Sequence, residues 1–146
     1  MEIYSTRFGP IQIEPSDILR FPEGLVGFAD CREWVLLADG LEPALAWMQS
    51  LDRPALTLAV VSPRRFVPGY RMRLNRRELA PLKLDGLKGA RVLVIVSKSN
   101  GSLTLNLKAP LVINLHRRLG RQVITNGDLP LRYEVAGEAH ILKMTA

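Results

Sequence analysis

The sequence is poor in the residues that build catalytic and metal centres. It contains one cysteine, Cys31, and two histidines, His116 and His140, in 146 residues. A single cysteine excludes an internal disulfide, and neither histidine stands at metal-ligand spacing from Cys31 or from the other histidine. No nucleophile elbow, phosphate-binding glycine loop or diagnostic carboxylate pair is found. We therefore expect no enzyme activity, no metal site and no cofactor.

Long apolar runs are also missing. No stretch approaches the 18 consecutive apolar residues of a membrane-spanning helix, and no apolar signal-peptide segment follows Met1. The sequence therefore predicts a cytoplasmic protein with no membrane association. A chain of this length is expected to fold as one domain that buries about 68–70% of the surface of the unfolded chain.

Acidic residues are outnumbered, since 20 lysines and arginines face 14 aspartates and glutamates, for a net charge of +6. A positive surface attracts anionic partners such as nucleic acids before any specific contact forms. The basic residues are nevertheless spread in short groups among the acids. Charge alone does not separate RNA contact from biased codon usage.

Short runs of alternating apolar and polar residues are abundant. This period of two is typical of strands with one buried face, and glycine, proline and asparagine separate the runs. The dipeptide Asn100-Gly101 predicts a tight hairpin. Without strand–helix alternation, the pattern predicts a mainly β fold, a small antiparallel β-barrel-like or sandwich domain with one short helix. The expected strands are 2–8, 11–13, 17–21, 33–38, 44–51, 55–61, 91–98, 103–108, 111–115, 122–126 and 131–135.

The short helix is expected after Asn75. Asn75 is a good N-cap, Glu78 stands at the capping-box position, and Pro81 limits the helix to a turn or two. The stretch from 103 to 124 predicts a three-stranded β-meander, broken at Pro110 and again by a turn at Gly120.

Two loops have more than one interpretation. In the loop 21–28, Phe21 and Phe28 either anchor an irregular segment in the core, with glycines supplying positive φ or close approach, or they belong to a partner-binding loop. Arginine-rich loops offer an alternative function. They give a small β-barrel the means to clamp RNA phosphates, with Phe66 and Tyr70 available for stacking, although solvated loop charges explain the same residues. The arginines of this alternative are Arg64, Arg65, Arg117, Arg118 and Arg121.

Several motifs taken together resemble one protein family. They are Phe8-Gly9 with Ile11, the loop 21–28, Trp47 to Leu51, Pro63 to Tyr70, and Asn106 to Asn114 followed by Gly120 to Ile124. In this order the motifs are similar to the bacterial flagellar assembly factor FliW family. The resemblance covers residues 1–135 as a single β domain. Residues 136–146 fall outside it as a C-terminal tail of uncertain order.

The resemblance implies a compact, mainly antiparallel β-barrel-like protein that binds proteins and catalyses nothing. Its implied partners are a CsrA-type translational regulator and flagellin. Flagellin would occupy the protein until export, after which the freed protein would bind the regulator and relieve repression of flagellin translation. Two mutually exclusive binding events are sufficient for this switch. We expect a monomer without direct nucleic-acid contact, and a basic protein favours steric or allosteric antagonism over charge repulsion of RNA.

The expected partner-binding residues are exposed loop and strand-end positions. Leu25 and Phe28 are candidate apolar anchors. The candidate polar contacts are the four amides Gln49, Asn106, Asn114 and Gln122. Alternatively, the amides satisfy buried backbone groups at strand breaks. Solvent exposure separates these two interpretations.

Overall fold

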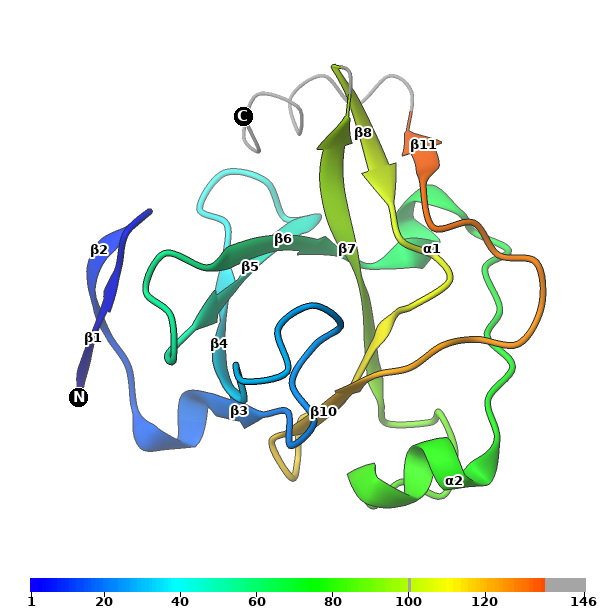
Figure 1. Ribbon diagram of the computed structural model, residues 1–146, viewed down its shortest axis with the longest axis horizontal. Coiled ribbons are helices and arrows are strands. Elements are labelled where there is room, and N and C mark those ends of the chain that lie inside the picture. Colours follow the sequence, from blue (N-terminus) through cyan, green and yellow to red (C-terminus); the bar gives the residue numbers. More distant parts are fainter. Residues whose placement is uncertain (100, 136–146) are drawn as a thin grey trace.

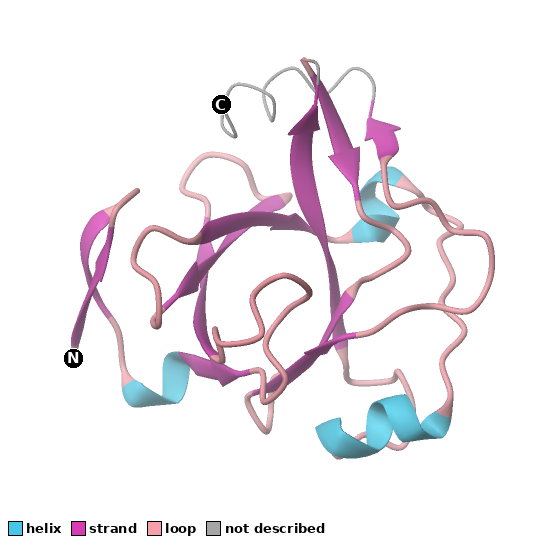
Figure 2. Cartoon of the chain, viewed as in Figure 1, coloured by secondary structure: helices cyan, strands magenta, loops and turns pink. Residues whose placement is uncertain are grey.

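The computed structural model describes residues 1–99 and 101–135, so Asn100 of the expected hairpin turn and the expected tail 136–146 lie outside the described residues. Figures 1 and 2 show a mainly β molecule with short helical turns. Its elements in chain order are β1 (Glu2–Ser5), β2 (Gly9–Gln12), η1 (Pro15–Asp17), β3 (Ile18–Arg20), β4 (Glu33–Ala38), β5 (Leu45–Ser50), β6 (Thr57–Val61), α1 (Pro63–Phe66), α2 (Arg76–Leu79), η2 (Ala80–Leu82), β7 (Arg91–Ser99), β8 (Ser102–Leu105), β9 (Leu111–Asn114), β10 (Leu119–Gln122) and β11 (Tyr133–Val135).

Strands β3, β4, β5, β6, β7, β9 and β10 close into a barrel. The sheet runs in sequence order from β3 to β7, and β7 also pairs with β9, which pairs with β10. A parallel pairing of Leu119 in β10 with Arg20 in β3 completes the ring. A closed sheet has no unpaired edge, so its backbone groups are satisfied all round. The expected mainly β, barrel-like fold class is confirmed, with this parallel contact joining otherwise antiparallel strands of the barrel.

Strands β8 and β9 both pair with β7 and not with each other. Leu105 of β8 stands opposite Val96, and Leu111 of β9 stands opposite Leu93. Five residues, 106–110, therefore stand opposite only two residues of β7, 94 and 95. The five residues bulge out of the ladder. The expected meander of three sequential strands is wrong, because Pro110 interrupts the pairing along β7 and does not separate neighbouring strands. The β7–β8 hairpin itself is confirmed, and β11 extends it.

Strand alternation builds a core on both faces of the sheet. In β5, Met48 packs inside the barrel, whereas Leu45 and Trp47 pack against the outer face. This explains why β5 and β6 are apolar on both parities. The interior cluster contains Leu19, Phe21, Leu25, Cys31, Trp34, Met48, Val60, Leu93, Leu111 and Ile113.

The connection from β3 to β4, residues 21–32, folds across one end of the barrel and is called the capping loop below (Figure 1). Phe21, Leu25 and Cys31 insert their side chains into the interior cluster. Gly24 has φ +66°, and a Cβ there would lie 2.5 Å from the Phe28 carbonyl oxygen. The interpretation of this segment as an irregular loop anchored in the core, with Gly24 needed for positive φ and close approach, is confirmed.

Gly120 lies inside β10, and the expected turn at this position is wrong. The turn falls before β10, where Arg118 adopts φ +55°. Gly120 is present because the Phe21 ring packs directly on its backbone: a Cβ at Gly120 would lie 2.3 Å from Phe21 Cζ. A packing requirement from a distant loop therefore imitates a turn signal in the sequence.

The short helix α2 begins at Arg76 with Asn75 as its N-cap residue, as expected. The expected capping box does not form, because the Asn75 side chain makes no cap hydrogen bond. Glu78 instead pairs with Arg121 of β10 at 3.2 Å. Another helical turn, α1, lies in the segment expected to be a loop, with Pro63 at its first position.

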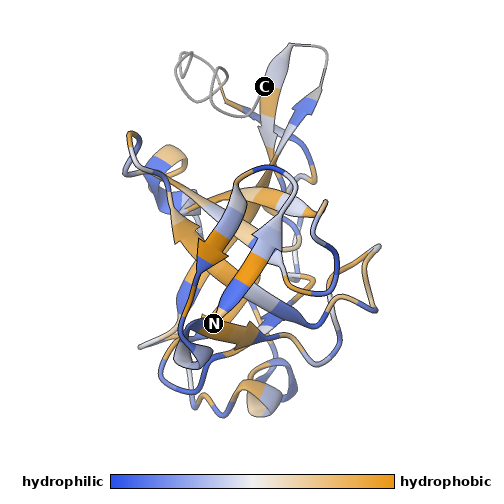
Figure 3. Cartoon of the chain, turned by 90° about the vertical axis from the view of Figure 1, so that its left-hand side faces the viewer, coloured by the Kyte–Doolittle hydropathy of each residue, from blue (hydrophilic) through white to orange (hydrophobic). Residues whose placement is uncertain are grey.

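The hairpin β1–β2 forms a separate two-stranded sheet beside the barrel. The turn of this hairpin packs on Trp47 of the barrel. The Trp47 ring meets the Phe8 ring edge-on, with ring centres 5.7 Å apart, and its centre lies 4.2 Å from the Arg7 guanidinium carbon. The alternation of hydrophobic and hydrophilic residues along the strands on this side is visible in Figure 3. Trp47 also donates its indole N–H to Asp39 Oδ1 at 3.0 Å, which lowers the pKa of that carboxyl.

Tyr70 anchors the connection between α1 and α2. Its hydroxyl donates to the Leu107 carbonyl oxygen at 2.6 Å inside the protein, and burial raises the pKa of Tyr70 to about 12. We expect Tyr70→Phe to lower the free energy of unfolding by about 1–2 kcal/mol, because the buried carbonyl of Leu107 loses this donor.

This contribution of Tyr70 depends on pH with a definite sign. A raised folded-state pKa gives stability that is complete below the ordinary value of 10.0 and is lost as the pH rises through about 12, because the unfolded chain releases the phenolic proton first. Urea unfolding followed by circular dichroism should therefore give a smaller difference between the wild type and Tyr70→Phe at pH 11 than at pH 8. An equal difference at both values would contradict this assignment.

Candidate protein-binding surface

Gln49 is completely buried near the end of β5, where it organises the turn before β6. Its Nε2 donates to the carbonyl oxygens of Ser50 at 3.0 Å, Pro54 at 3.1 Å and Leu56 at 3.3 Å. Its Oε1 accepts the hydroxyl hydrogen of Thr57. Because Pro54 also accepts the Thr6 N–H, this turn connects the β1–β2 hairpin to the barrel.

The two asparagines hold the segments on either side of β9. Asn106 Oδ1 accepts the Ala109 N–H at 3.0 Å and shapes the bulge between β8 and β9. Asn114 is 6% exposed, donates to the Leu82 carbonyl at 2.8 Å and accepts the Arg117 N–H at 3.2 Å. Asn114 therefore attaches the helical turn η2 to the barrel.

Gln122 connects the capping loop to the same bulge. Its Oε1 accepts the Val26 N–H at 2.8 Å, and its Nε2 donates to the Ala109 carbonyl at 3.1 Å. All four amides thus satisfy backbone groups at strand breaks, as the second interpretation states. The expectation that they are all exposed contacts is wrong for Gln49 and Asn114, because both are buried against the backbone groups that they bond.

The two expected apolar anchors differ in exposure. Leu25 is 3% exposed and belongs to the barrel interior, so it is not an exposed anchor. Phe28 is half-buried at the other side of a two-residue turn, with the Arg53 guanidinium carbon 6.0 Å from its ring centre. Between them Val26 is 71% exposed at the tip of the capping loop. Sequence reasoning missed Val26, and the only signal for it was its place beside Gly27 in a turn.

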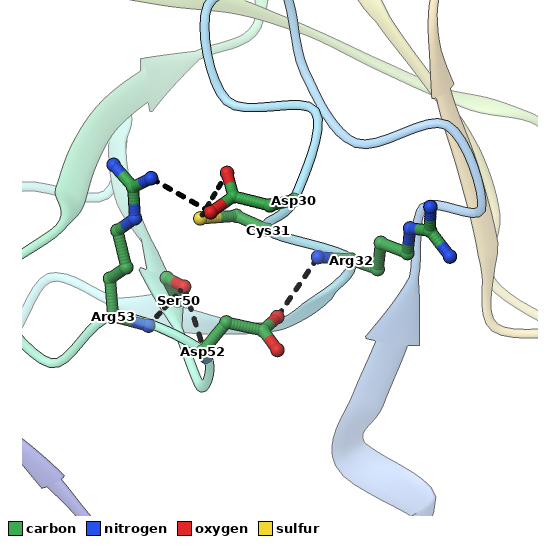
Figure 4. A network of polar contacts seen from close by, with 6 residues as sticks. All are labelled: Asp30, Cys31, Arg32, Ser50, Asp52 and Arg53. Atoms are coloured by element: carbon green, nitrogen blue, oxygen red, sulfur yellow. Dashed lines mark hydrogen bonds and ion pairs between the residues drawn. The ribbon is translucent and has the colours of Figure 1, made fainter.

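The capping loop ends in a polar network, shown in Figure 4. Arg53 pairs with Asp30 at 2.8 Å and holds the pKa of this exposed carboxyl below its ordinary value. Asp52 Oδ2 accepts the Arg32 N–H at 2.9 Å. Cys31 is completely buried, with its Sγ 3.8 Å from Asp30 Oδ1. The network fastens the capping loop to the β5–β6 turn, and Cys31 contributes packing.

The arginines of the RNA-binding alternative are not gathered in one patch. Arg121 pairs with Glu23 at 2.9 Å and with Glu78, and Arg118 donates to the Asp17 carbonyl at 2.7 Å. These two side chains have structural roles. Arg117 is exposed in the turn before β10, whereas Arg64 and Arg65 lie together on α1.

The described part of the chain carries neither a metal-binding cluster nor a membrane-spanning helix. Residues 1–99 and 101–135 contain no group of three or more histidine, cysteine, aspartate or glutamate side chains arranged to hold a metal ion. Within the same ranges, no helix has the length and apolar character needed to cross a membrane.

Comparisons with known proteins agree with this architecture. A family model described as FliW protein matches residues 2–135. The flagellar assembly factor FliW of Bdellovibrio bacteriovorus is 39% identical over 135 residues, which cover 90% of this chain and 77% of the relative. That of Syntrophus aciditrophicus is 37% identical over 138 residues, covering 92% and 87%. A crystal structure of the flagellar assembly factor FliW has a TM-score of 0.80 at 33% identity, covering 92% of this chain and 94% of that chain.

Proposed function

The chain belongs to the FliW family, and on this basis we propose that it is a flagellar assembly factor that binds a CsrA-type translational regulator and flagellin as alternative partners. In this proposal the protein acts in the cytoplasm as a monomer. Flagellin holds it until export, after which the freed protein binds the regulator and relieves repression of flagellin translation. The match of residues 2–135 to the family model is the observation that carries the proposal.

The chemistry of the described side chains supports binding as the activity. The sulfur of Cys31 is buried, and His116 is exposed in a turn. The amides that the sequence singles out hold loops in place. These residues preorganise a surface, which reduces the entropy lost when a partner binds.

We propose that the capping loop provides part of this surface. Gln122 and the Arg53–Asp30 pair hold the loop, and Val26 projects from its tip beside the half-buried Phe28. A fixed apolar tip bordered by polar groups is a typical interface centre. In this arrangement Gln122 and Asn106 act as positioning residues, and Val26 and Phe28 touch the partner.

Calorimetry with the purified regulator and flagellin of the same cell tests the partner switch. We expect the protein to bind each, and saturation with flagellin to abolish binding of the regulator, because the two binding events exclude each other. Simultaneous binding of both partners would contradict the switch. Failure to bind either one would overturn the proposed function.

Val26→Asp is expected to weaken binding of at least one partner by about tenfold or more, because a charge replaces an apolar contact at the interface centre. The backbone hydrogen bond from Val26 to Gln122 is retained, so the fold should be unaffected. Leu41→Asp is the matched control, since Leu41 is 90% exposed in the β4–β5 turn. Equal effects of the two variants on both partners would argue against the capping loop.

A further inference from the structure

A groove of about 430 Å³ lies at the barrel end opposite the capping loop. It is formed where β5 begins, β6 ends and β7 begins, together with α1. Because β4 and β5 are antiparallel, with Ala38 opposite Ala46 and Trp34 opposite Ser50, these strand ends are far from the capping loop before β4. The groove is therefore separate from the Val26 tip.

Three arginines line this groove, Arg64 and Arg65 from α1 and Arg91 from the start of β7. Within the described residues none of the three is in an ion pair, and no lining residue carries a carboxylate. Arg64 uses its Nε to donate to the Tyr70 carbonyl at 3.2 Å, which fixes the direction of its side chain. The nearest acid in sequence, Glu42, accepts the Ala44 N–H through Oε1 at 3.0 Å. The lining of the groove thus carries three guanidinium groups and no carboxylate.

The floor of the groove is apolar. Ala44 and Ala46 supply its accessible surface, Val60 and Leu93 are buried beneath them, and Pro43 lies at its edge. A second hollow of about 250 Å³ shares Ser62 and Arg64 with the groove and is lined further by Met72 and Val92, among others. Ser62 and Arg64 border both hollows, and the groove itself holds all three guanidinium groups.

We propose that this groove binds an extended acidic peptide segment of a protein partner. Aspartate or glutamate side chains would pair with Arg65 and Arg91, and a small apolar side chain would occupy the floor at Ala44 and Ala46. Planar guanidinium groups suit carboxylates because they bind them through two parallel hydrogen bonds. The inference rests on the proposed function to the extent that the partner is a protein, and it assigns the chemistry of the segment recognised.

The aromatic residues near the groove favour a peptide over RNA. Single-stranded RNA is held by bases stacked on exposed aromatic rings as well as by arginine. Tyr70 is 4% exposed and hydrogen-bonded, and Phe66 is half-buried with the Arg65 guanidinium carbon 5.6 Å from its ring centre. The groove therefore offers charge and an apolar floor but no free stacking platform.

Fluorescence anisotropy with a labelled eight-residue peptide that alternates glutamate and leucine tests the proposal. We expect Arg65→Glu combined with Arg91→Glu to weaken peptide binding at least tenfold, and a glutamine–leucine peptide to bind the wild type at least tenfold more weakly. The matched control combines Arg77→Glu and Arg117→Glu, which changes net charge equally at two exposed positions outside the groove. This control should retain peptide binding within about twofold.

The possible outcomes separate the alternatives. Equal losses in the groove and control variants would show non-specific charge attraction and overturn the proposal, as would absence of binding to the wild type at 1 mM peptide. Tighter binding of an eight-nucleotide oligouridine, lost in the groove variant, would identify an RNA site and also overturn it. Failure of the proposed function appears instead as loss of wild-type binding to the regulator and to flagellin, an assay that does not use the peptide.

Discussion

Gln49→Glu is expected to lower the free energy of unfolding by about 3–5 kcal/mol at pH 7. The substitution hardly changes the size of the side chain, so it leaves no cavity. In the wild type, Nε2 donates to three carbonyl oxygens. The substitution puts a carboxylate oxygen in its place, which repels these three oxygens. Gln49 is 0% exposed, so bulk solvent does not reach the charge.

The pH dependence of the Gln49→Glu variant tests this cause. Burial without a counter-charge raises the pKa of the introduced carboxyl, so the stability deficit should shrink as the pH falls from 7 to 5 and the group takes up a proton. Urea unfolding at both values measures the change. Gln49→Met, which is neutral and similar in size, should be less destabilised, and its deficit should be independent of pH. Equal deficits for the Met and Glu variants at pH 7 would rule out charge as the cause.

Gly120→Ala is expected to lower the free energy of unfolding by about 2–3 kcal/mol through overpacking. The new methyl group would lie 2.3 Å from Phe21 Cζ and 2.5 Å from Phe21 Cε1, and the ring is itself completely buried. Either the ring or β10 has to move. Because the ring closes the capping end of the barrel, the variant should also loosen the loop that carries Val26.

Thermal unfolding of matched variants separates overpacking from a general effect of alanine. Gly40→Ala is the control, since Gly40 has open space around its position and its φ lies outside the left-handed region. It should leave the melting temperature nearly unchanged. Phe21→Leu combined with Gly120→Ala should be less destabilised than the sum of the two single variants, because the smaller side chain leaves room for the methyl group. Strict additivity would show that the two residues do not clash.

The four amides show why local pattern was insufficient to assign the candidate site. Gln49 and Asn114 interrupt apolar strands, and a polar residue in such a place signals either a contact with a partner or a backbone group in need of a hydrogen bond. The choice depends on which loop returns to that point. Gln122 binds Val26, which is 96 residues away in the chain, and Asn114 binds Leu82. No short-range signal contains this information.

The arginines illustrate the same limit for charge. Arg118 and Arg121 are close to Arg117 in the sequence. Their side chains nevertheless form contacts within the protein, with Asp17, Glu23 and Glu78. Arg91 has no arginine neighbour in the sequence and nevertheless lies beside Arg64 and Arg65 in the groove. A patch is formed by residues close in space, so counting arginine pairs along the chain gives the wrong set.

Strands β3 to β7, the N-cap of α2 and the β7–β8 hairpin could be predicted from the sequence, because period-two alternation and turn residues act over a few residues. The order of the motifs along the chain was sufficient for the family resemblance. Three features could not be predicted in this way: β10 returns to β3 to close the barrel, residues 106–110 bulge from β7, and Gly120 makes room for Phe21. These features depend on contacts between segments far apart in the chain. In the sequence each of them is marked only by a single residue, and a single residue shows no periodic pattern from which a structure can be predicted.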